Sequence, residues 1–375
     1  MLRDSPGHLP SPAKEVRARM LAAVTKSPGV MVLDDVADPG PPGPEDVILR
    51  PEVVGICGSD LHMYSGDVGA LSGARSFFPR IQGHELGAVI AETGADCPRG
   101  LRAGDRVAVW PLRGCRRCYP CRIGRGNACV SLELVGIHRD GGLQQLLCVP
   151  ATQVFGVGDL DPESAAFIEP MSIALHAVHR ADAHPGQRIV VLGAGPIGLA
   201  TVVAATAAGA RVMVTEPVAG RRDLAARMGA ELVAWGDHGE LLAAVGQWTR
   251  GHGPPRVIDT TGDPAALAQA AQLVCSAGRV VVVGMSAAAA PLRSGVFPEK
   301  EIDVVGSSCA TAAEFRAAVR LVQAHRDSIA ALLTHRFPLT RVREAIECAA
   351  GSHPGVVKVL ITVNDHNGHG GTRHE

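Results

Sequence analysis

Residues 188–216 read RIVVLGAGPIGLATVVAATAAGARVMVTE. The apolar runs at the two ends of this stretch are typical of buried strands, and the small residues between them are typical of a helix. Further apolar runs at 257–259 and 280–283 continue the same alternation. Because strands that alternate with helices form parallel sheets, residues 172–308 are expected to form an α/β, doubly wound domain.

The turn between the first strand and the helix carries the pattern G-x-G-x-x-G. In this pattern Gly193 permits the tight turn, Gly195 lets the backbone approach a pyrophosphate, and Gly198 allows close packing of helix on strand. The helix N-terminus, which begins at Pro196 and Ile197, adds N–H donors and a partial positive charge. We therefore expect these five residues to bind a dinucleotide cofactor.

An acidic residue, Glu216, closes the second strand at about the 20-residue offset expected for the group that binds a ribose 2′-hydroxyl. A carboxylate there repels a 2′-phosphate, so NAD is favoured over NADP. Arg221 and Arg222 follow closely, and either arginine is able to accept that phosphate, so NADP stays open. A purely structural turn followed by a surface glutamate would leave the joint placement of strand, helix and acid unexplained.

Four cysteines are spaced C-x2-C-x2-C-x7-C, and they are Cys115, Cys118, Cys121 and Cys129. Four thiolates close a tetrahedral shell around Zn²⁺ and leave no position for a substrate, so this pattern predicts a structural zinc site. The alternatives are a chance cluster or two disulfides. Disulfides do not fit a chain in which no signal peptide is recognised.

The composition excludes several classes of protein. At 375 residues, with 46% apolar and 19% charged residues, the chain is long and apolar enough for two well-buried domains. A net charge of −1 gives no electrostatic case for nucleic acid or an anionic membrane as partner. No apolar run has transmembrane length, and a cytoplasmic location is expected.

The two ends of the chain differ from the middle. Short strand-like runs at 30–33, 47–50 and 107–109 predict a mostly β first half. A helix at 312–323 and a last strand at 356–363 are expected near the C-terminus. The expected division is a flexible extension (1–19), a zinc-binding catalytic domain (20–171 and 309–363), a dinucleotide-binding domain (172–308) and a disordered tail (364–375).

Three short segments carry candidate metal ligands: Cys57 lies in VGICGSDLH, His84 and Glu85 in GHELG, and Glu169 in FIEPMS. Taken singly, each has an ordinary explanation as a core thiol, a core histidine or a surface acid. Together they supply one thiolate, one imidazole and carboxylates. That donor set is how proteins hold a catalytic Zn²⁺ with one open position.

Taken together, these segments resemble the zinc-dependent medium-chain dehydrogenase/reductase family, and within it the sorbitol (polyol) and sugar-acid dehydrogenase-like branch. The resemblance runs from about Met20 to Val363 and implies a GroES-like, mostly-β catalytic domain plus a Rossmann cofactor domain. The matching segments, in order, are Gly55–Asp60, Gly83–Glu85, the four-cysteine lobe, Glu169–Pro170, Gly193–Gly198 and Thr334–Leu339.

The resemblance implies a set of catalytic zinc ligands. Cys57 and His84 would bind the metal, and Glu85, Glu169 or an intervening water would complete the shell. Which glutamate is bonded at rest stays open at this point.

The resemblance also implies roles for three neighbours of Cys57. Asp60 would orient the zinc-bound histidine. Ser59 and His62 would form a proton relay that runs through the cofactor ribose to solvent. For His62 the alternative is an ordinary histidine on a helix surface.

The implied reaction is oxidation of a secondary alcohol of a polyol, cyclitol or sugar acid, with hydride transfer to NAD and one catalytic and one structural zinc per chain. Homodimers or homotetramers are expected, with the strand region at 280–283 and the residues just after it as a candidate interface. Alternatives are an L-threonine 3-dehydrogenase-like or other alcohol dehydrogenase, a zinc-free quinone or enone reductase, and an inactive dinucleotide-binding homologue.

Some positions depart from the polyol pattern. Met63 stands where an aromatic residue is usual, and residues 306–311 lack an arginine. The segment 135–142, VGIHRDGG, resembles sugar-acid dehydrogenases instead, and its His138 and Arg139 are either a carboxylate clamp or part of an ordinary loop. An insert at residues 66–76 is expected to line the pocket.

Overall fold

The computed structural model describes residues 18–67, 77–98, 100–351 and 355–364. The expected extension at 1–19 (up to residue 17), the insert at 66–76 (from residue 68) and the tail at 364–375 (from residue 365) lie outside the described residues. Within the described part of the chain, no helix is both long and apolar enough to cross a membrane.

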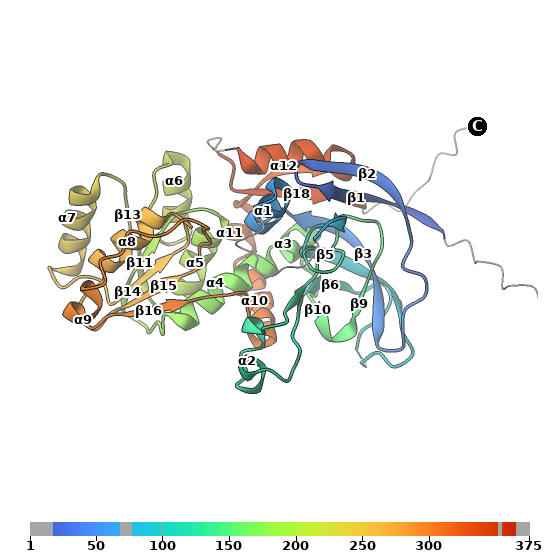
Figure 1. Cartoon of the computed structure of the whole chain (residues 1–375), viewed down its shortest axis with the longest axis horizontal. Coiled ribbons are helices and arrows are strands. Elements are labelled where there is room, and N and C mark those ends of the chain that lie inside the picture. Colours follow the sequence, from blue (N-terminus) through green and yellow to red (C-terminus); the bar gives the residue numbers. More distant parts are fainter. Residues whose placement is uncertain (1–17, 68–76, 99, 352–354, 365–375) are drawn as a thin grey trace, which may run out of the picture.

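The first half of the chain is mostly β, as the sequence predicts (Figure 1). Its main strands are β1 (Arg19–Ser27), β2 (Val30–Ala37), β3 (Asp46–Gly55), β4 (Arg80–Ile81), β5 (Glu85–Thr93), β6 (Arg106–Val109), β9 (Leu147–Pro150) and β10 (Val154–Gly156). Strands β2, β1 and β4 form one antiparallel sheet. The long strand β3 is buried along most of its length, which places it at the centre of the second sheet.

The second sheet includes strands from the far end of the chain. Its order is β10-β6-β5-β3-β18-β17, and β9 also pairs with β3. The two late strands are β17 (Leu333–Pro338) and β18 (Lys358–Thr362). Since β18 pairs antiparallel with β3, residues near the C-terminus come to lie beside residues near position 55. This pairing brings a late residue into the site described below.

The middle of the chain forms a six-stranded parallel sheet of order β13-β12-β11-β14-β15-β16. The strands are β11 (Arg188–Leu192), β12 (Arg211–Thr215), β13 (Leu232–Ala234), β14 (Arg256–Asp259), β15 (Arg279–Val282) and β16 (Asp303–Gly306). The helices between them are α5 (Pro196–Ala207), α6 (Ala219–Arg227), α7 (His238–Thr249), α8 (Pro264–Leu273) and α9 (Val296–Lys300). The strand order reverses between β11 and β14, which is where such sheets bind dinucleotides.

The edge of the parallel sheet is β16, so the part of the expected interface at 280–283 does not itself lie at a sheet edge. Strand β15 is an interior strand, because β16 pairs with it along its whole length. The sequence pattern missed β16 because only two consecutive apolar residues, Val304 and Val305, lie between Asp303 and Gly306, which is shorter than the apolar run of a buried strand.

Two crossings join the parallel sheet to the β-rich part (Figure 1). The first runs through α3 (Pro162–Ala166) and α4 (Ile168–Arg180), and the second is the segment 307–311, which leads into α10 (Ala312–Ala324). Helix α4 packs against both α5 and α10. The chain then continues through α11 (Arg326–Ala330) and α12 (Val342–Ala350).

One apolar cluster runs across these crossings. It joins residues of β3, α4, β11 and α10, and its largest fully buried side chains include Phe167 and Phe315. With aromatic residues at only 3% of the chain, the core is made mostly of Ala, Val, Leu and Ile. The helices of the crossings are thus held in a well-packed interior, which keeps side chains at their ends in defined positions.

Candidate active site

Three of the expected catalytic ligands meet at one end of β3 and β5. The ligand atoms of Cys57, His84 and Glu85 all lie within 4.8 Å of one another. Cys57 is the N-cap of α1 (Gly58–Ser65), which follows β3, and Glu85 is the first residue of β5. Because Gly55 pairs with Glu85 across these antiparallel strands, the two loops that carry the donors come together.

The imidazole of His84 has its two nitrogens in different surroundings. Its Nε2 atom lies 3.5 Å from Ser59 Oγ, and its Nδ1 atom lies 3.7 Å from Asp60 Oδ1 and has no hydrogen-bond partner. Burial alone would lower the pKa of His84, but the Asp60 carboxylate and Cys57 raise it well above its usual range. The same negative surroundings favour a cation beside Nε2, so this donor set fits a metal ion.

Asp60 ties the two ligand loops together. It is buried, and one carboxylate oxygen accepts a hydrogen bond of 2.9 Å from the backbone N–H of Cys57. The other oxygen accepts a hydrogen bond of 3.3 Å from the N–H of Gly83, directly before His84. Its expected position beside the histidine therefore agrees with the geometry.

Glu85 is paired with a residue that the sequence argument missed. The Lys358 ammonium on β18 donates to Glu85 Oε1 at 2.5 Å and to the Ile56 carbonyl at 2.8 Å, and both side chains of the pair are buried. Burial would lower the pKa of Lys358, but the negative charges of Glu85 and Cys57 outweigh it and raise the pKa. A lysine inside the apolar strand VVKVLIT was a usable signal, because buried lysines are rare unless paired.

Glu169 lies close to this group but outside it. It is in the first turn of α4 and is 8% exposed. Burial, opposed by His84 and helped by the Glu85 carboxylate, raises its pKa to about 7. Among the described residues, the group whose ligand atoms lie within 4.8 Å of one another holds Glu85 and not Glu169.

The two expected relay residues, Ser59 and His62, both lie on α1. The Ser59 hydroxyl is at the cluster, beside His84. The His62 ring is partly exposed and faces Asp67, with 3.5 Å between His62 Nδ1 and Asp67 Oδ2. The structure therefore brings Ser59 to the metal ligands and directs His62 toward the surface.

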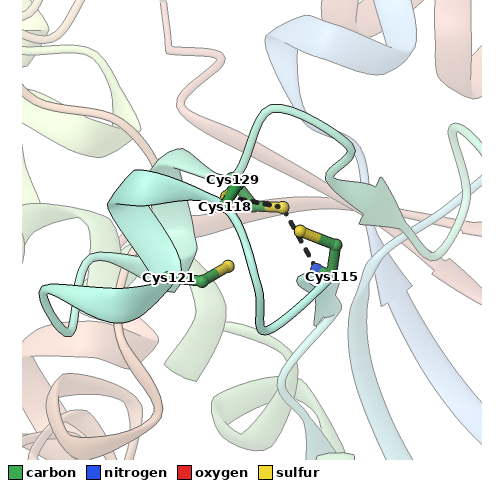
Figure 2. A group of neighbouring side chains, drawn as sticks. All are labelled: Cys115, Cys118, Cys121 and Cys129. Carbon is green, nitrogen blue, oxygen red and sulfur yellow. Dashed lines mark hydrogen bonds between the residues drawn. The ribbon is translucent and has the colours of Figure 1, made fainter.

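The four cysteines of the lobe converge in space (Figure 2). They surround α2 (Tyr119–Arg122) and the 3-10 turn η2 (Gly126–Ala128), and their sulfur atoms all lie within 4.8 Å of one another. All ten cysteines of the chain are free thiols, so the disulfide alternative is wrong. Strands β7 (Leu112–Arg113) and β8 (Glu133–Leu134) pair at the base of the lobe.

Backbone donors prepare this lobe for thiolates. Cys129 Sγ accepts hydrogen bonds from the N–H groups of Cys115 at 3.1 Å and Ser131 at 3.3 Å. Backbone N–H groups lower the pKa of Cys118 to about 6, whereas burial and the neighbouring thiols raise the pKa of Cys121 to about 12. Thiols that compete for ionisation in this way fit a shared divalent cation, which stabilises all four thiolates.

The glycine-rich turn has the shape that a dinucleotide requires. A Cβ atom on Gly198 would lie 2.1 Å from the carbonyl oxygen of Gly193, so helix and strand pack too closely for a side chain. A Cβ atom on Gly195, the N-cap of α5, would meet nothing within 4 Å, so that side of the turn is open. Pro196 and Ile197 form the first two positions of α5.

The acid and the arginines after β12 are already engaged. Glu216 is buried and accepts hydrogen bonds from the N–H groups of Ala194 at 2.7 Å and Val218 at 2.9 Å. Arg221 donates to the carbonyl of Val356 at 2.9 Å. Arg222 donates to the carbonyls of Glu216 at 3.0 Å and Pro217 at 2.6 Å.

The loop with the possible carboxylate clamp packs beside the metal ligands. A Cβ atom on Gly141 would lie 2.2 Å from the carbonyl oxygen of Gly83, so the two loops touch. His138 Nδ1 accepts a hydrogen bond of 3.1 Å from the N–H of Leu134, and its ring lies against Phe77. Met63 is fully buried beside Phe77, so it belongs to a small core and does not face solvent.

Two family models match the chain. Residues 43–159 match "Alcohol dehydrogenase GroES-like domain" and residues 196–324 match "Zinc-binding dehydrogenase". A curated relative, the L-galactonate-5-dehydrogenase of Escherichia coli K12, is 34% identical over 325 residues, which is 86% of this chain and 93% of the relative.

Two solved structures share the fold. One, RspB of Escherichia coli CFT073, described as an alcohol dehydrogenase and bound to NADH, is 28% identical with a TM-score of 0.82, covering 92% of this chain and 99% of that chain. The other is a zinc-binding dehydrogenase of Sinorhizobium meliloti 1021 bound to NADP. It is 31% identical with a TM-score of 0.83 and covers 92% of this chain and 100% of that chain.

Proposed function

We propose a function that starts from one premise: the chain belongs to the zinc-dependent medium-chain dehydrogenase/reductase family. It is an oxidoreductase that acts on CH–OH donors and uses zinc and a nicotinamide cofactor. Within that frame, the protein oxidises a secondary alcohol of a sugar acid or a related polyol or cyclitol to the ketone, with NAD as the hydride acceptor. The observation that carries this proposal is the convergence of Cys57, His84 and Glu85.

Cys57, His84 and a glutamate are proposed to hold the catalytic zinc, with Glu85 and Glu169 both available. One thiolate and one imidazole leave room for a substrate, unlike the four thiolates of the lobe, which would hold the structural zinc. Lys358 pairs with Glu85, so the buried Glu85 carboxylate keeps a partner when Glu169 binds the metal.

Zinc bound here supplies a Lewis acid for the substrate oxygen, and the nicotinamide supplies the hydride acceptor. The residues of the chain orient and deprotonate the substrate. Ser59 Oγ is placed to accept the hydroxyl proton, because it lies on the Nε2 side of His84. The Asp60 carboxylate lies 3.7 Å from Nδ1 of His84 and accepts a hydrogen bond from the N–H of Gly83, so it would orient the ring through its charge and through the backbone before it.

We propose that the proton leaves by way of His62. Its partly exposed ring beside Asp67 suits a group that exchanges protons with solvent near neutral pH. No hydrogen bond joins Ser59 to His62 within the part of the chain that the structure describes. The cofactor ribose would therefore have to complete the path, as the family resemblance implies.

NAD is proposed over NADP. The buried Glu216 carboxylate supports this preference, because a 2′-phosphate placed beside it would meet a negative charge. Arg221 and Arg222 each donate to a backbone carbonyl through one terminal nitrogen, which ties both guanidinium groups to the backbone beside Glu216 and Val356. The turn from Gly193 to Gly198 would bind the pyrophosphate.

A sugar acid is the substrate class that we favour. The relative named for L-galactonate supports this choice, as does the resemblance of the loop at 135–142 to sugar-acid dehydrogenases. Because His138 is occupied by Leu134 and Phe77, Arg139 is the better candidate in that loop for binding a carboxylate. A neutral polyol has no carboxylate for Arg139 to bind.

Three further proposals concern organisation. The division into a catalytic domain (20–171 and 309–363) and a cofactor domain (172–308) is kept. A homodimer or homotetramer is proposed, with the β16 edge as its contact. A cytoplasmic location would keep the four-cysteine lobe reduced.

The test is NADH formation at alkaline pH by zinc-loaded protein, with sugar acids, polyols, cyclitols and threonine as substrates and NADP⁺ in parallel. The expected result is turnover of a sugar acid with NAD⁺, lost when Cys57 is replaced by serine. Turnover of threonine alone, or of neutral polyols alone, would contradict the sugar-acid proposal. No turnover of any alcohol by protein that contains both zinc ions would contradict the proposed activity.

A further inference from the structure

A buried asparagine in the four-cysteine lobe reaches both crossings between the sheets. Asn127 is 4% exposed and lies in η2, between the lobe ligands Cys121 and Cys129. Its Nδ2 atom donates to the carbonyl of Ser308 at 2.8 Å, which is 181 residues away in the sequence. The same nitrogen lies 3.3 Å from Nε2 of His176 on α4.

His176 connects Asn127 to the start of α10. Its Nδ1 atom lies 3.0 Å from both carboxylate oxygens of Glu314, which is itself buried. Glu314 also accepts hydrogen bonds from the N–H and hydroxyl of Thr311, both at 2.8 Å, and from His179 Nδ1 at 2.8 Å. With Nδ1 facing the Glu314 carboxylate, the arrangement suits a His176 ring that donates through Nδ1 and accepts from Asn127 through Nε2.

One of the two segments that Asn127 touches, α4, also carries a residue that lies beside the catalytic cluster. Glu169 is about two helical turns, or roughly 10 Å, before His176 on the same face of α4. On the second crossing, Cys309 follows Ser308 directly.

The second crossing is held on both sides of Cys309. Cys309 has a φ of 51°, a conformation that L-residues rarely adopt. Asn127 holds the carbonyl before it, and the Trp110 Nε1–H donates to the carbonyl of Ala310 after it at 2.9 Å. Such a backbone conformation persists only when neighbouring contacts enforce it.

We propose that Asn127 is a positioning residue that ties the four-cysteine lobe to the catalytic cluster, by holding α4 and the segment 307–311 in register with each other. The metal of the lobe orders the turn that carries Asn127, because that turn lies between two of its ligands. The structural zinc therefore sets the geometry of the catalytic zinc site, including the position of Glu169. This inference rests on the proposed function for its catalytic consequence but not for its metal chemistry.

The test compares Asn127→Ala with Asn364→Ala. Asn364 is a matched control, because its amide also bridges two carbonyls, Pro51 at 2.7 Å and Gln145 at 3.1 Å, and it plays no part in the proposed site. Each protein is loaded with zinc in the lobe and cobalt in the catalytic cluster, and the cobalt absorption spectrum and cobalt retention during dialysis are measured. Asn127→Ala is expected to change the spectrum and to lose cobalt faster, whereas Asn364→Ala matches the wild type.

The kinetic arm uses the substrate found in the activity panel. A reacting group that is misplaced by about 1 Å lowers the rate of catalysis by up to about 100-fold. Asn127→Ala is therefore expected to lower kcat by about 10- to 100-fold, with a smaller change in KM. The double variant Asn127→Ala with Glu169→Gln should lose less kcat than the product of the two single losses, because both substitutions act on α4. The effects of Asn364→Ala and Glu169→Gln on kcat should multiply, because the two residues act independently.

The outcomes separate the two proposals. A wild type that turns over no substrate, with a changed cobalt spectrum in Asn127→Ala, would defeat the proposed function and keep the link between the sites. A wild-type cobalt spectrum and retention in Asn127→Ala would overturn the link, whatever the activity. If Asn127→Ala fails to fold, Asn127→Ser retains a donor for one of the two partners and takes its place, with an intermediate spectrum expected.

Discussion

The ion pair between Lys358 and Glu85 is the most demanding prediction, since both side chains are almost completely buried, at 2% and 1% exposure. Replacing Lys358 by methionine removes the ammonium but keeps a side chain of similar length. The Glu85 carboxylate then stays buried without its partner, and the carbonyl of Ile56 loses a donor. Breaking a buried pair in this way costs about 3–5 kcal/mol in the free energy of unfolding.

Urea unfolding of four proteins measures this cost: the wild type, Lys358→Met, Glu85→Gln and the double variant. The double variant is expected within about 2 kcal/mol of the wild type, because it leaves no unpaired charge in the interior. The measurements are made with zinc in the lobe and with the catalytic metal removed. Zinc added to the catalytic cluster should restore more stability to Lys358→Met than to the wild type, since a cation then replaces the ammonium.

A loss below about 1 kcal/mol for Lys358→Met would refute the reasoning, because that is the value of a solvated surface pair. A double variant as unstable as Lys358→Met would refute it as well. In that case the lost packing of the lysine stem, and not the unpaired carboxylate, would account for the cost.

Three other predictions follow from the same geometry. Gly198→Ala places a Cβ atom against the Gly193 carbonyl, so the affinity for NADH, measured by fluorescence, should fall by at least about tenfold. The zinc content should stay unchanged. Unchanged NADH affinity would mean that the turn does not bind the pyrophosphate. Cys118→Ser should lower the zinc content from two ions to one per chain by atomic absorption, and two retained ions would show that the lobe is not a four-thiolate site. A hydrogen bond with Glu314 raises the pKa of His179, so the stabilisation by His179 is present below the unfolded pKa of about 6.5 and is lost as the pH rises through the raised value. His179→Gln should therefore make the free energy of unfolding less dependent on pH across that range. An unchanged pH profile would contradict the pairing of His179 with Glu314.

Much of the cofactor site was readable in the sequence because its parts are local. The turn from Gly193 to Gly198 and the acid at Glu216 belong to one strand–helix–strand unit, whose geometry is nearly the same wherever that unit occurs. The four cysteines of the lobe lie within a short loop, so covalent connection alone keeps their thiols close enough to share a metal. Spacing was therefore sufficient to predict that these residues lie together in both places.

The catalytic cluster was predicted only in part. The donor types at Cys57, His84 and Glu85 suggested zinc, but their proximity depends on the pairing of β3 with β5. Lys358 enters the same site from 273 residues away because β18 pairs with β3. An apolar strand pattern predicts that a strand is buried, and it does not say which neighbour the strand will choose.

The family, the glycine-rich turn, the four-cysteine lobe and the donor types of the catalytic cluster could all be predicted from the sequence. Three features follow only from the complete fold: β16 is the sheet edge, Lys358 pairs with Glu85, and Asn127 joins the lobe to α4 and to the second crossing. The physical reason is the same in each case. Contacts within a turn or loop follow from chain connectivity, whereas contacts between distant segments follow from strand register and helix packing, which only the complete fold specifies.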